Sequence, residues 1–217
     1  MRNSRRFCGV SPVSLTTGVA MVLFCALALT GCATRPAEFK LEPGYRSLYN
    51  GKDLSGWGYQ AANGAVSDLG GKTESTDGRY TAEVGFIRVH PWDTSKGPHF
   101  RQLWTTAYFP TNFHLLLEFR SGTNADSGLY LRNLNSQLQV RDYYVAGPPE
   151  FKALKKYRPQ DWNTLDVTVK GNTAVCLCNG ELMQPQPALR LPADGHVGLE
   201  AARGQMDYRR IRFKEIP

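Results

Sequence analysis

The chain has 217 residues, a formal net charge of +7 and 41% hydrophobic residues, which is enough apolar content for a folded core. The positive charge is spread along the chain, and residues 155–158 and 209–212 are its main clusters. Because the chain lacks a basic tract, an aromatic RNA-binding pattern and a recognition helix, we expect no nucleic-acid partner.

The N-terminus is typical of the secretory signal of a bacterial lipoprotein. Three arginines precede an apolar run that is densest over residues 19–29 and ends in Leu29-Thr-Gly-Cys32. Small residues before the cysteine admit the signal peptidase, and the thiol of Cys32 would receive the diacylglycerol. The run is shorter than the ~20 apolar residues of a membrane-spanning helix. We therefore expect residues 1–31 to be removed and lipidated Cys32 to anchor the chain to the membrane.

This signal divides the chain into three expected segments. Residues 1–31 form the signal peptide, residues 32–43 the lipidated cysteine and tether, and residues 44–217 one folded domain. Removal of residues 1–31 leaves 186 of the 217 residues, enough for one sizeable core. The signal holds three arginines and no acid, so the formal charge falls from +7 to +4. Ala33 rather than Asp follows the cysteine, which in a two-membrane bacterium favours the outer membrane, facing the periplasm.

Short strands separated by turns are predicted along the whole domain. Residues 45–57 predict a short strand and an Asn-Gly turn with the ring of Trp57 under that loop. Residues 149–157 predict one or two helical turns. Loops are expected at residues 63–78 and 91–100. Strands are expected at residues 80–84, 86–90, 102–106, 113–120, 127–132, 137–141, 164–170, 173–178, 196–200 and 208–213. This spacing predicts an all-β sandwich or jelly roll.

Polar chemistry coincides with strand periodicity between residues 113 and 142. In each strand of this stretch, apolar side chains alternate with polar ones. If the three strands are neighbours, one sheet face gathers Glu118, Arg120, Tyr130, Arg132, Gln137, Gln139 and Arg141. A solvated face of an antiparallel sheet is the alternative. The many planar hydrogen-bonding groups favour recognition of hydroxyls and carbonyls, as in a sugar site.

Other side chains of the domain give weaker indications of a disulfide, a metal site or sugar binding. Cys176 and Cys178 are two residues apart on one strand face, so a disulfide would strain the backbone, and we expect two small apolar side chains. No matched spacing of Cys and His predicts a metal site. Four histidines share no ligand spacing, although His114 lies on the face of Glu118. Oxygen groups at residues 122–127 fit a calcium ion or, more simply, a turn. Three tryptophans fit either sugar stacking or the core: Trp92, Trp104 and Trp162.

The run Ser47-Leu-Tyr-Asn-Gly-Lys-Asp-Leu-Ser-Gly-Trp57 resembles the opening of the 3-keto-disaccharide hydrolase domain family. The resemblance continues through residues 113–120, 127–132, 138–142 and 161–163 and reaches residues 208–211. It implies a concanavalin A-like jelly roll of two antiparallel sheets, with a sugar site on the concave face. It also implies hydrolysis of glycosides already oxidised at C3. The sequence has no Gly-rich phosphate motif, and we expect no cofactor.

The implied chemistry needs a base near the acidic C–H beside the ketone, and donors near the enolate oxygen. Glu118 is the candidate base, and Arg120 and Arg132 are the candidate donors. The candidate substrate ligands are Tyr130, Gln137, Gln139, His114 and Asp142. An ion pair with Arg120 or Arg132 that only holds the sheet is the alternative role for Glu118.

Two positions depart from the family pattern. Asp126 stands where the family usually has Asn, and Gln137 stands where it usually has Glu. Because Gln cannot accept a proton, two functions stay open. The first is a lipid-anchored hydrolase of 3-keto-glycosides, which acts by base-assisted elimination and hydration. The second is a non-catalytic carbohydrate-binding or scaffold lipoprotein of the cell envelope.

Overall fold

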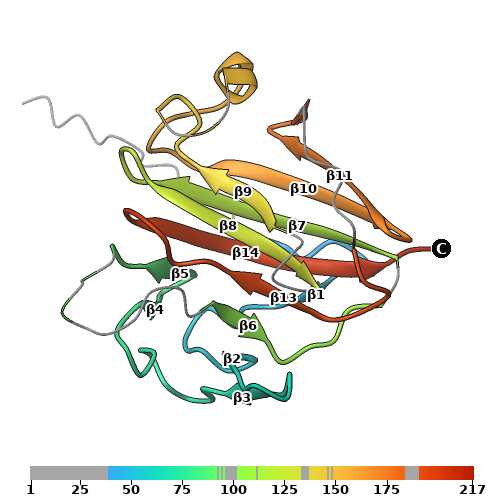
Figure 1. Cartoon of the computed structure of the whole chain (residues 1–217). Coiled ribbons are helices and arrows are strands. Elements are labelled where there is room, and N and C mark those ends of the chain that lie inside the picture. Colours follow the sequence, from blue (N-terminus) through green and yellow to red (C-terminus); the bar gives the residue numbers. More distant parts are fainter. Residues whose placement is uncertain are drawn as a thin grey trace, which may run out of the picture. The chain divides into compact units, whose positions relative to one another are not determined.

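The computed structural model describes residues 39–91, 93, 95, 102–110, 112–132, 137–145, 147, 149–183 and 191–217. The chain divides into two compact units, Met1–Phe39 and Lys40–Pro217. In the second unit, all paired strands are antiparallel and form two sheets (Figure 1).

The larger sheet has eight strands within the described residues. Seven of them follow in the order β12 (Glu181–Leu182), β11 (Thr173–Cys178), β10 (Asn163–Lys170), β7 (Phe113–Ser121), β14 (Met206–Glu215), β5 (Phe86–Val89) and β4 (Tyr80–Glu83). The eighth strand, β1 (Arg46–Ser47), pairs with β14. Since β4 to β5 and β10 to β11 are successive in the chain, both ends of this sheet are built from hairpins.

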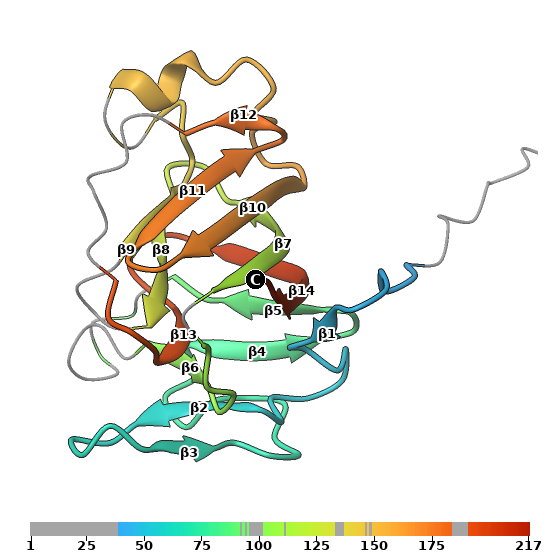
Figure 2. The same cartoon turned by 90° about the vertical axis from the view of Figure 1, so that its right-hand side faces the viewer.

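The smaller sheet has six described strands. They follow in the order β3 (Val66–Asp68), β2 (Trp57–Gln60), β6 (Leu103–Thr105), β13 (His196–Leu199), β8 (Asp126–Arg132) and β9 (Gln137–Arg141). Seen from the side, β8, β9 and β13 lie to one side of the layer that contains β7, β10 and β14 (Figure 2). A 3-10 helix, η2 (Pro149–Ala153), follows β9.

The core lies between the two sheets. Leu115, Leu117 and Phe119 alternate along β7 and are fully buried, as are Leu129 and Leu131 on β8. Side chains of a strand alternate between its two faces, so these buried residues show which face of each sheet is turned toward the core. Burying each such side chain stabilises the fold by roughly 1.5–3 kcal/mol. The chain is therefore an all-β jelly-roll sandwich, which confirms the predicted fold class.

The opening loop, residues 48–57, has a structural role. The ring of Trp57 is fully buried, and its indole N–H donates to the carbonyl of Leu48 at 2.6 Å. Asn50 Oδ1 accepts from the backbone N–H groups of Lys52 and Asp53. The predicted Asn-Gly turn with Trp57 beneath it is confirmed, and these residues hold the first loop closed rather than forming a reactive site.

One segment that was predicted to be a loop contains a strand. Residues 63–78 were predicted to form a loop, but β3 lies within them and pairs with β2. The side chains of β3 are half-buried or exposed at the edge of the sheet. An edge strand of this kind buries too little apolar surface to produce a clear sequence period.

Candidate functional site

Successive strands β7 and β8 belong to different sheets, so the expectation of one shared polar face is wrong. β7 lies in the eight-stranded sheet, whereas β8 and β9 pair in the six-stranded sheet. Their core-facing residues point toward each other, so their polar residues point in opposite directions. Glu118 and Arg120 are thus on one outer side of the sandwich, and Tyr130, Gln137 and Gln139 are on the other. The turn between β7 and β8 carries the chain across the sandwich.

Glu118 forms two ion pairs on the outer face of the eight-stranded sheet. Its carboxylate lies 2.6 Å from Arg209 Nε and 2.7 Å from Arg210 Nη1. The pairing of β14 with β7 is irregular between Arg209 and Arg212, and Arg210 has a φ of 51°. This bulge lets two successive arginines reach the same carboxylate. These ion pairs agree with the alternative role of Glu118, which was to hold the sheet, but its partners are Arg209 and Arg210 instead of Arg120 or Arg132.

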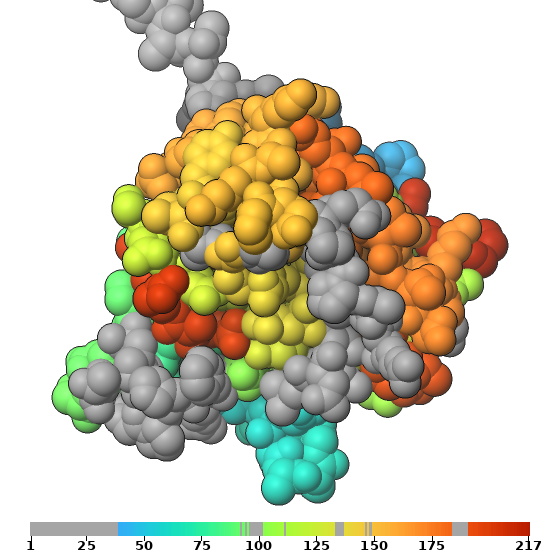
Figure 3. All heavy atoms as spheres, turned by 45° about the horizontal axis from the view of Figure 1, so that its top comes forward, coloured from blue at the N-terminus to red at the C-terminus, as the bar shows by residue number. Residues whose placement is uncertain are grey.

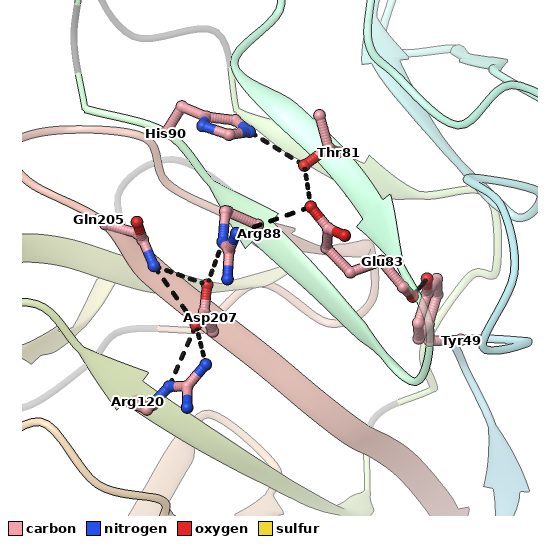
Figure 4. Close-up of polar contacts among 8 residues, drawn as sticks. All are labelled: Tyr49, Thr81, Glu83, Arg88, His90, Arg120, Gln205 and Asp207. Carbon is pink, nitrogen blue, oxygen red and sulfur yellow. Dashed lines mark hydrogen bonds and ion pairs between the residues drawn. The ribbon is translucent and has the colours of Figure 1, made fainter.

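Arg120 is also held by a carboxylate. Its Nε and Nη2 lie 3.1 and 2.6 Å from the fully buried Asp207, which also accepts from Arg88 at 3.0 Å. Gln205 completes the cluster (Figure 4). The guanidinium of Arg120 lies 4.7 Å from the ring centre of Trp162. These contacts tie three strands of the larger sheet together, far from the side on which Tyr130 lies.

Arg132 does not continue the outward alternation of β8. Its φ is 74°, and its buried guanidinium donates to the carbonyls of Pro110, Gly171 and Pro192 at 2.6–3.0 Å. A planar group with several donors suits this task, because one side chain can satisfy three loop carbonyls. Arg132 therefore fastens loops together, and the expected shared face with Glu118 is wrong for it too.

His114 and Asp142 also lie apart from Tyr130 and Gln137. His114 hydrogen-bonds Tyr45 at 2.5 Å and Asp166 at 2.6 Å on the larger sheet. Asp142 is buried and accepts from the backbone N–H of Asn124 at 3.0 Å. Each has local partners that account for its position.

A second cluster lies on the outer face of the six-stranded sheet. We call it the Glu200 cluster and define it as Trp104, Tyr130, Gln137 and Glu200. The Tyr130 hydroxyl donates to Glu200 Oε1 at 2.9 Å, and Gln137 Nε2 donates to Oε2 at 2.5 Å. The ring centres of Trp104 and Tyr130 are 5.7 Å apart.

The Glu200 cluster is separate from the hydrophobic core. Trp104 and Tyr130 are only 3% and 6% exposed, yet neither packs in the core cluster. Alternation explains this, because Leu129 and Leu131 on either side of Tyr130 point inward. In the space-filling view β9, in yellow, reaches the surface below η2 (Figure 3).

Two glycines make room for this cluster. A Cβ at Gly128 would lie 2.2 Å from Gln137 Nε2, and a Cβ at Gly198 would lie 2.7 Å from Trp104 Cε3. Gln137 therefore crosses bare backbone of β8 to reach Glu200. Trp104 likewise lies over bare backbone of β13 and approaches Tyr130. Close approach of a side chain to a sheet requires glycine at such positions.

Burial and neighbouring charges set the proton affinity of this cluster. Burial raises the pKa of Glu200, while its hydrogen bonds to Tyr130 and Gln137 act in the opposite direction. Burial and the charge of Glu200 raise the pKa of Tyr130, and a hydrogen bond from Gln102 lowers it. A carboxylate in such surroundings holds a proton more tightly than an exposed one, which suits a general base near neutral pH.

Glu200 was missed by sequence reasoning, although the strand at residues 196–200 was predicted. The sequence feature that could have indicated Glu200 is the alternation of residues 196–200, which places Glu200 on the same face as Gly198. Trp104 was left open between sugar stacking and the core, and it lies outside the core. Gln139 and Arg141 share the face of Gln137, with Arg141 at 3.0 Å from Asp126.

Cys176 and Cys178 are buried and form no disulfide, and burial raises the pKa of each thiol to about 12. The prediction of two small apolar side chains is confirmed. Within the described residues, no group of three or more His, Cys, Asp and Glu side chains is placed to hold a metal ion. In the same part of the chain, no helix has the length and apolar character to cross a membrane. Cys32 and Trp92 lie outside the described residues.

The molecule is thus a β-sandwich in which one outer sheet face carries a carboxylate, an amide and two aromatic rings in contact. The model of the 3-keto-alpha-glucoside-1,2-lyase-like domain matches residues 44–214, and the chain belongs to this family. The resemblance found in the sequence is thereby confirmed. Membership supports a carbohydrate-processing function and a hydrolase.

Solved structures agree with the fold. Two candidate glycosyl hydrolases from Parabacteroides distasonis match with TM-scores of 0.59 and 0.56 and identities of 16% and 15%. The matches cover 80% and 79% of this chain, and 94% and 99% of the P. distasonis chains. At this identity the likeness concerns the fold alone. No curated protein matches the chain.

Proposed function

We propose that the chain cleaves 3-keto-glycosides by elimination between C1 and C2, with Glu200 as the base, followed by addition of water. The family description names a 3-keto-alpha-glucoside-1,2-lyase, which is an enzyme for this elimination. The observation that carries the proposal is the buried Glu200 carboxylate, which is held between Tyr130 and Gln137, with the ring of Trp104 against Tyr130.

The reaction suits these groups. The ketone at C3 makes the hydrogen at C2 acidic, so a single carboxylate can remove it and form an enolate. Expulsion of the glycosidic oxygen from C1 then completes the elimination. The partly exposed Gln139 offers an amide for the hydroxyls of a sugar. The paired carboxylates of ordinary glycosidases are not needed for this route.

Glu200 also accounts for the departure at position 137. The family usually has Glu there, and the Gln137 amide of this chain contacts the Glu200 carboxylate directly. A carboxylate and an amide therefore still meet at this point of the sheet, with the carboxylate placed at the end of β13, on the far side of β8. This supports an active enzyme over a chain that has lost its base.

The membrane location is part of the proposal. Cys32, once lipidated, would anchor the enzyme to the cell envelope, with the outer membrane facing the periplasm as the expected location. Incorporation of labelled fatty acid into the wild type, and its loss in Cys32→Ser, would support this anchor. Equal labelling of both proteins would exclude Cys32 as the modified residue.

The test of function uses the full-length chain and a panel of glucosides chemically oxidised at C3. We expect the wild type to release the alcohol. The rate of release by Glu200→Gln should be lower by at least about a hundredfold, because a positioned base contributes on the order of 10²–10⁴-fold to the rate. Glu118→Gln is the matched control on the opposite sheet and should keep most of the activity. Loss in Glu118→Gln with activity in Glu200→Gln would restore the assignment made from sequence.

Wild-type protein that binds these sugars without turnover would favour the carbohydrate-binding alternative. In that case Glu200→Gln should bind as the wild type does, since its shape is nearly unchanged. The comparison of binding and turnover on the same sugars therefore separates the two functions.

A further inference from the structure

Four arginines lie on the outer face of the eight-stranded sheet, above the carboxylates that hold them. The side chains of the arginines are 28–35% exposed, whereas the carboxylates are 0% and 15% exposed. We call this group the arginine patch; it consists of Arg88, Arg120, Arg209 and Arg210 over Asp207 and Glu118. A partner of this face would therefore meet guanidinium groups before it meets carboxylates.

Basic residues outnumber acidic ones over the whole of this outer face. Alternation along β4, β5, β7, β10 and β14 turns six of their acidic and basic pairs of faces apart, and with the residues that lead into β1 the outward side chains are seven basic and five acidic. The basic ones are Arg88, Arg120, Lys170, Arg209, Arg210, Arg212 and Lys214, and the acidic ones are Glu42, Glu83, Glu118, Asp166 and Asp207. This excess of positive charge suits an anionic partner.

The ring of Trp162 lies against two guanidinium groups of the arginine patch. Its centre is 3.9 Å from the guanidinium carbon of Arg209 and 4.7 Å from that of Arg120. The ring of Phe86 meets Trp162 edge-on, with 6.0 Å between the ring centres, and both rings are partly exposed. Partly exposed tryptophan beside arginine is typical of protein surfaces that lie at a membrane–water interface.

The chain enters the domain on the same face. The carboxylate of Glu42 accepts two hydrogen bonds from Arg212 on β14, both at 2.6 Å. The hydroxyl of Tyr45 hydrogen-bonds His114 on β7 at 2.5 Å. Because the residues that follow Arg212 and His114 on these strands are buried in the core, Arg212 and His114 point to the outer side.

The segment between this entry and the proposed lipid anchor is short. Lys40 is eight residues after Cys32, and eight residues span at most about 29 Å. A lipid on Cys32 would therefore keep the membrane within this distance of the entry, which lies where β1 pairs with β14.

We infer that the outer face of the eight-stranded sheet rests on a membrane surface of anionic phospholipid head groups, with the arginine patch and Trp162 at the contact. This inference rests on the lipid anchor of the proposed function. Guanidinium groups bind phosphate through two parallel hydrogen bonds, so the head groups match the side chains that this face presents. The entry of the chain on the same face favours a membrane over a soluble anionic partner.

This orientation also suits the proposed chemistry. The Glu200 cluster lies on the outer face of the other sheet, so contact through the arginine patch turns Glu200 and Gln139 away from the lipid. Soluble sugars could then reach the site while the chain stays on the membrane.

The first experiment is hydroxyl-radical footprinting, read by peptide mass, on the full-length chain with Cys32→Ser, so that no lipid is attached. Oxidation of Trp162 should fall several-fold with vesicles of phosphatidylcholine and phosphatidylglycerol, and should stay unchanged with phosphatidylcholine alone. Tyr108 is the internal control, because it is 60% exposed and contacts His196 of the smaller sheet. Equal protection of Tyr108, or no protection of Trp162, would overturn the inference.

A soluble acidic polysaccharide is the competing partner, and polygalacturonate serves as its probe in the same footprint. Protection of Trp162 by the anionic vesicles and not by polygalacturonate supports the membrane. The reverse result would overturn the membrane contact and assign this face to acidic polysaccharides.

The second experiment measures sedimentation with the anionic vesicles. Arg209→Gln combined with Arg210→Gln should bind about tenfold to thirtyfold more weakly, because each basic residue near an anionic surface contributes about 1 kcal/mol. Lys152→Gln combined with Arg203→Gln is the matched control, since it removes the same charge from exposed residues that follow β9 and β13. Equal weakening in both variants would mean that only net charge matters and would overturn the specific face.

The inference and the proposed function fail in different ways. Fatty-acid labelling of Cys32 without protection of Trp162 would keep the anchor and overturn the contact of this face. Protection of Trp162 without labelling of Cys32 would keep the contact and remove the anchor. Turnover of 3-keto-glucosides is measured without vesicles and depends on neither result.

Discussion

The side-chain amide of Gln137 on β9 donates to the carboxylate of Glu200, which directly follows β13, although β8 lies between β9 and β13. The contact is possible because the intervening residue of β8 has no side chain.

Gly128→Ala tests this relationship. The added Cβ would overlap Gln137 Nε2 and push the amide away from Glu200. Loss of a hydrogen bond to a charged group costs about 1.5–3 kcal/mol, so we expect kcat/KM to fall on the order of tenfold to a hundredfold. Gly70→Ala, where the new Cβ meets only ordinary contacts, is the control. Unchanged kinetics in Gly128→Ala would show that Gln137 is dispensable to the base.

The pH dependence of stability tests the burial of Glu200. Burial raises the pKa of Glu200 in the folded chain above its ordinary value of 4.5. The folded state then holds its proton more tightly than the unfolded state, so this contribution is fully present below about pH 4.5 and is lost as the pH rises through the folded pKa.

Glu200→Gln lacks this titration. Its melting temperature relative to the wild type should therefore rise between pH 4 and pH 8, as measured by calorimetry. The difference between the two proteins removes the contributions of the other carboxylates. Parallel curves for the two proteins would show that Glu200 titrates normally and is not desolvated.

Asp207 should matter for stability rather than for chemistry. It is fully buried, so Asp207→Ala would leave Arg120 without its carboxylate and Arg88 with Glu83 at 3.7 Å. Because the two guanidinium groups are partly exposed, we expect a loss of about 1.5–3 kcal/mol, the range for hydrogen bonds to charged groups. Asp161→Ala, which breaks an exposed pair with Arg158, should cost about 0–1 kcal/mol. Urea unfolding of the two variants measures the contrast, and equal losses would contradict it.

The two buried thiols should react only after unfolding. Cys176 and Cys178 have pKa values raised to about 12 by burial, so almost no thiolate forms at pH 8. Alkylation with iodoacetamide, mapped by peptide mass, should leave both unmodified in the native chain and label both in guanidinium chloride. Rapid labelling of the native protein would mean that β11 opens easily.

The sequence predicted the strands well where one face of each strand is apolar. Leu115 and Leu117 on β7, and Leu129 and Leu131 on β8, have the period that packing requires, and these strands form where expected. The sandwich follows from their number and spacing. The strand at residues 66–68 was not predicted, because its side chains do not pack in the core and so give no clear apolar period.

The site was harder to predict because sheet membership is a long-range property. The turn between β7 and β8 has the composition of a hairpin, yet its chain crosses between the sheets. Glu118 and Tyr130 are therefore near in sequence and on opposite sides of the fold. Glu200 and Gln137 are far apart in sequence and in contact, and only the pairing of β13 and β9 with β8 brings them together.

Alternate residues of strand β8 face two different surroundings. Leu129 and Leu131 pack in the hydrophobic core, while Gly128 and Tyr130 lie on the other face of the sheet, next to Gln137 and Glu200. Under the proposed function, substitutions at Gly128 and Tyr130 would change the site with little repacking of Leu129 and Leu131. A systematic mutational scan of β8 should therefore show a tolerance to substitution that alternates from one residue to the next, because the two sets have different neighbours.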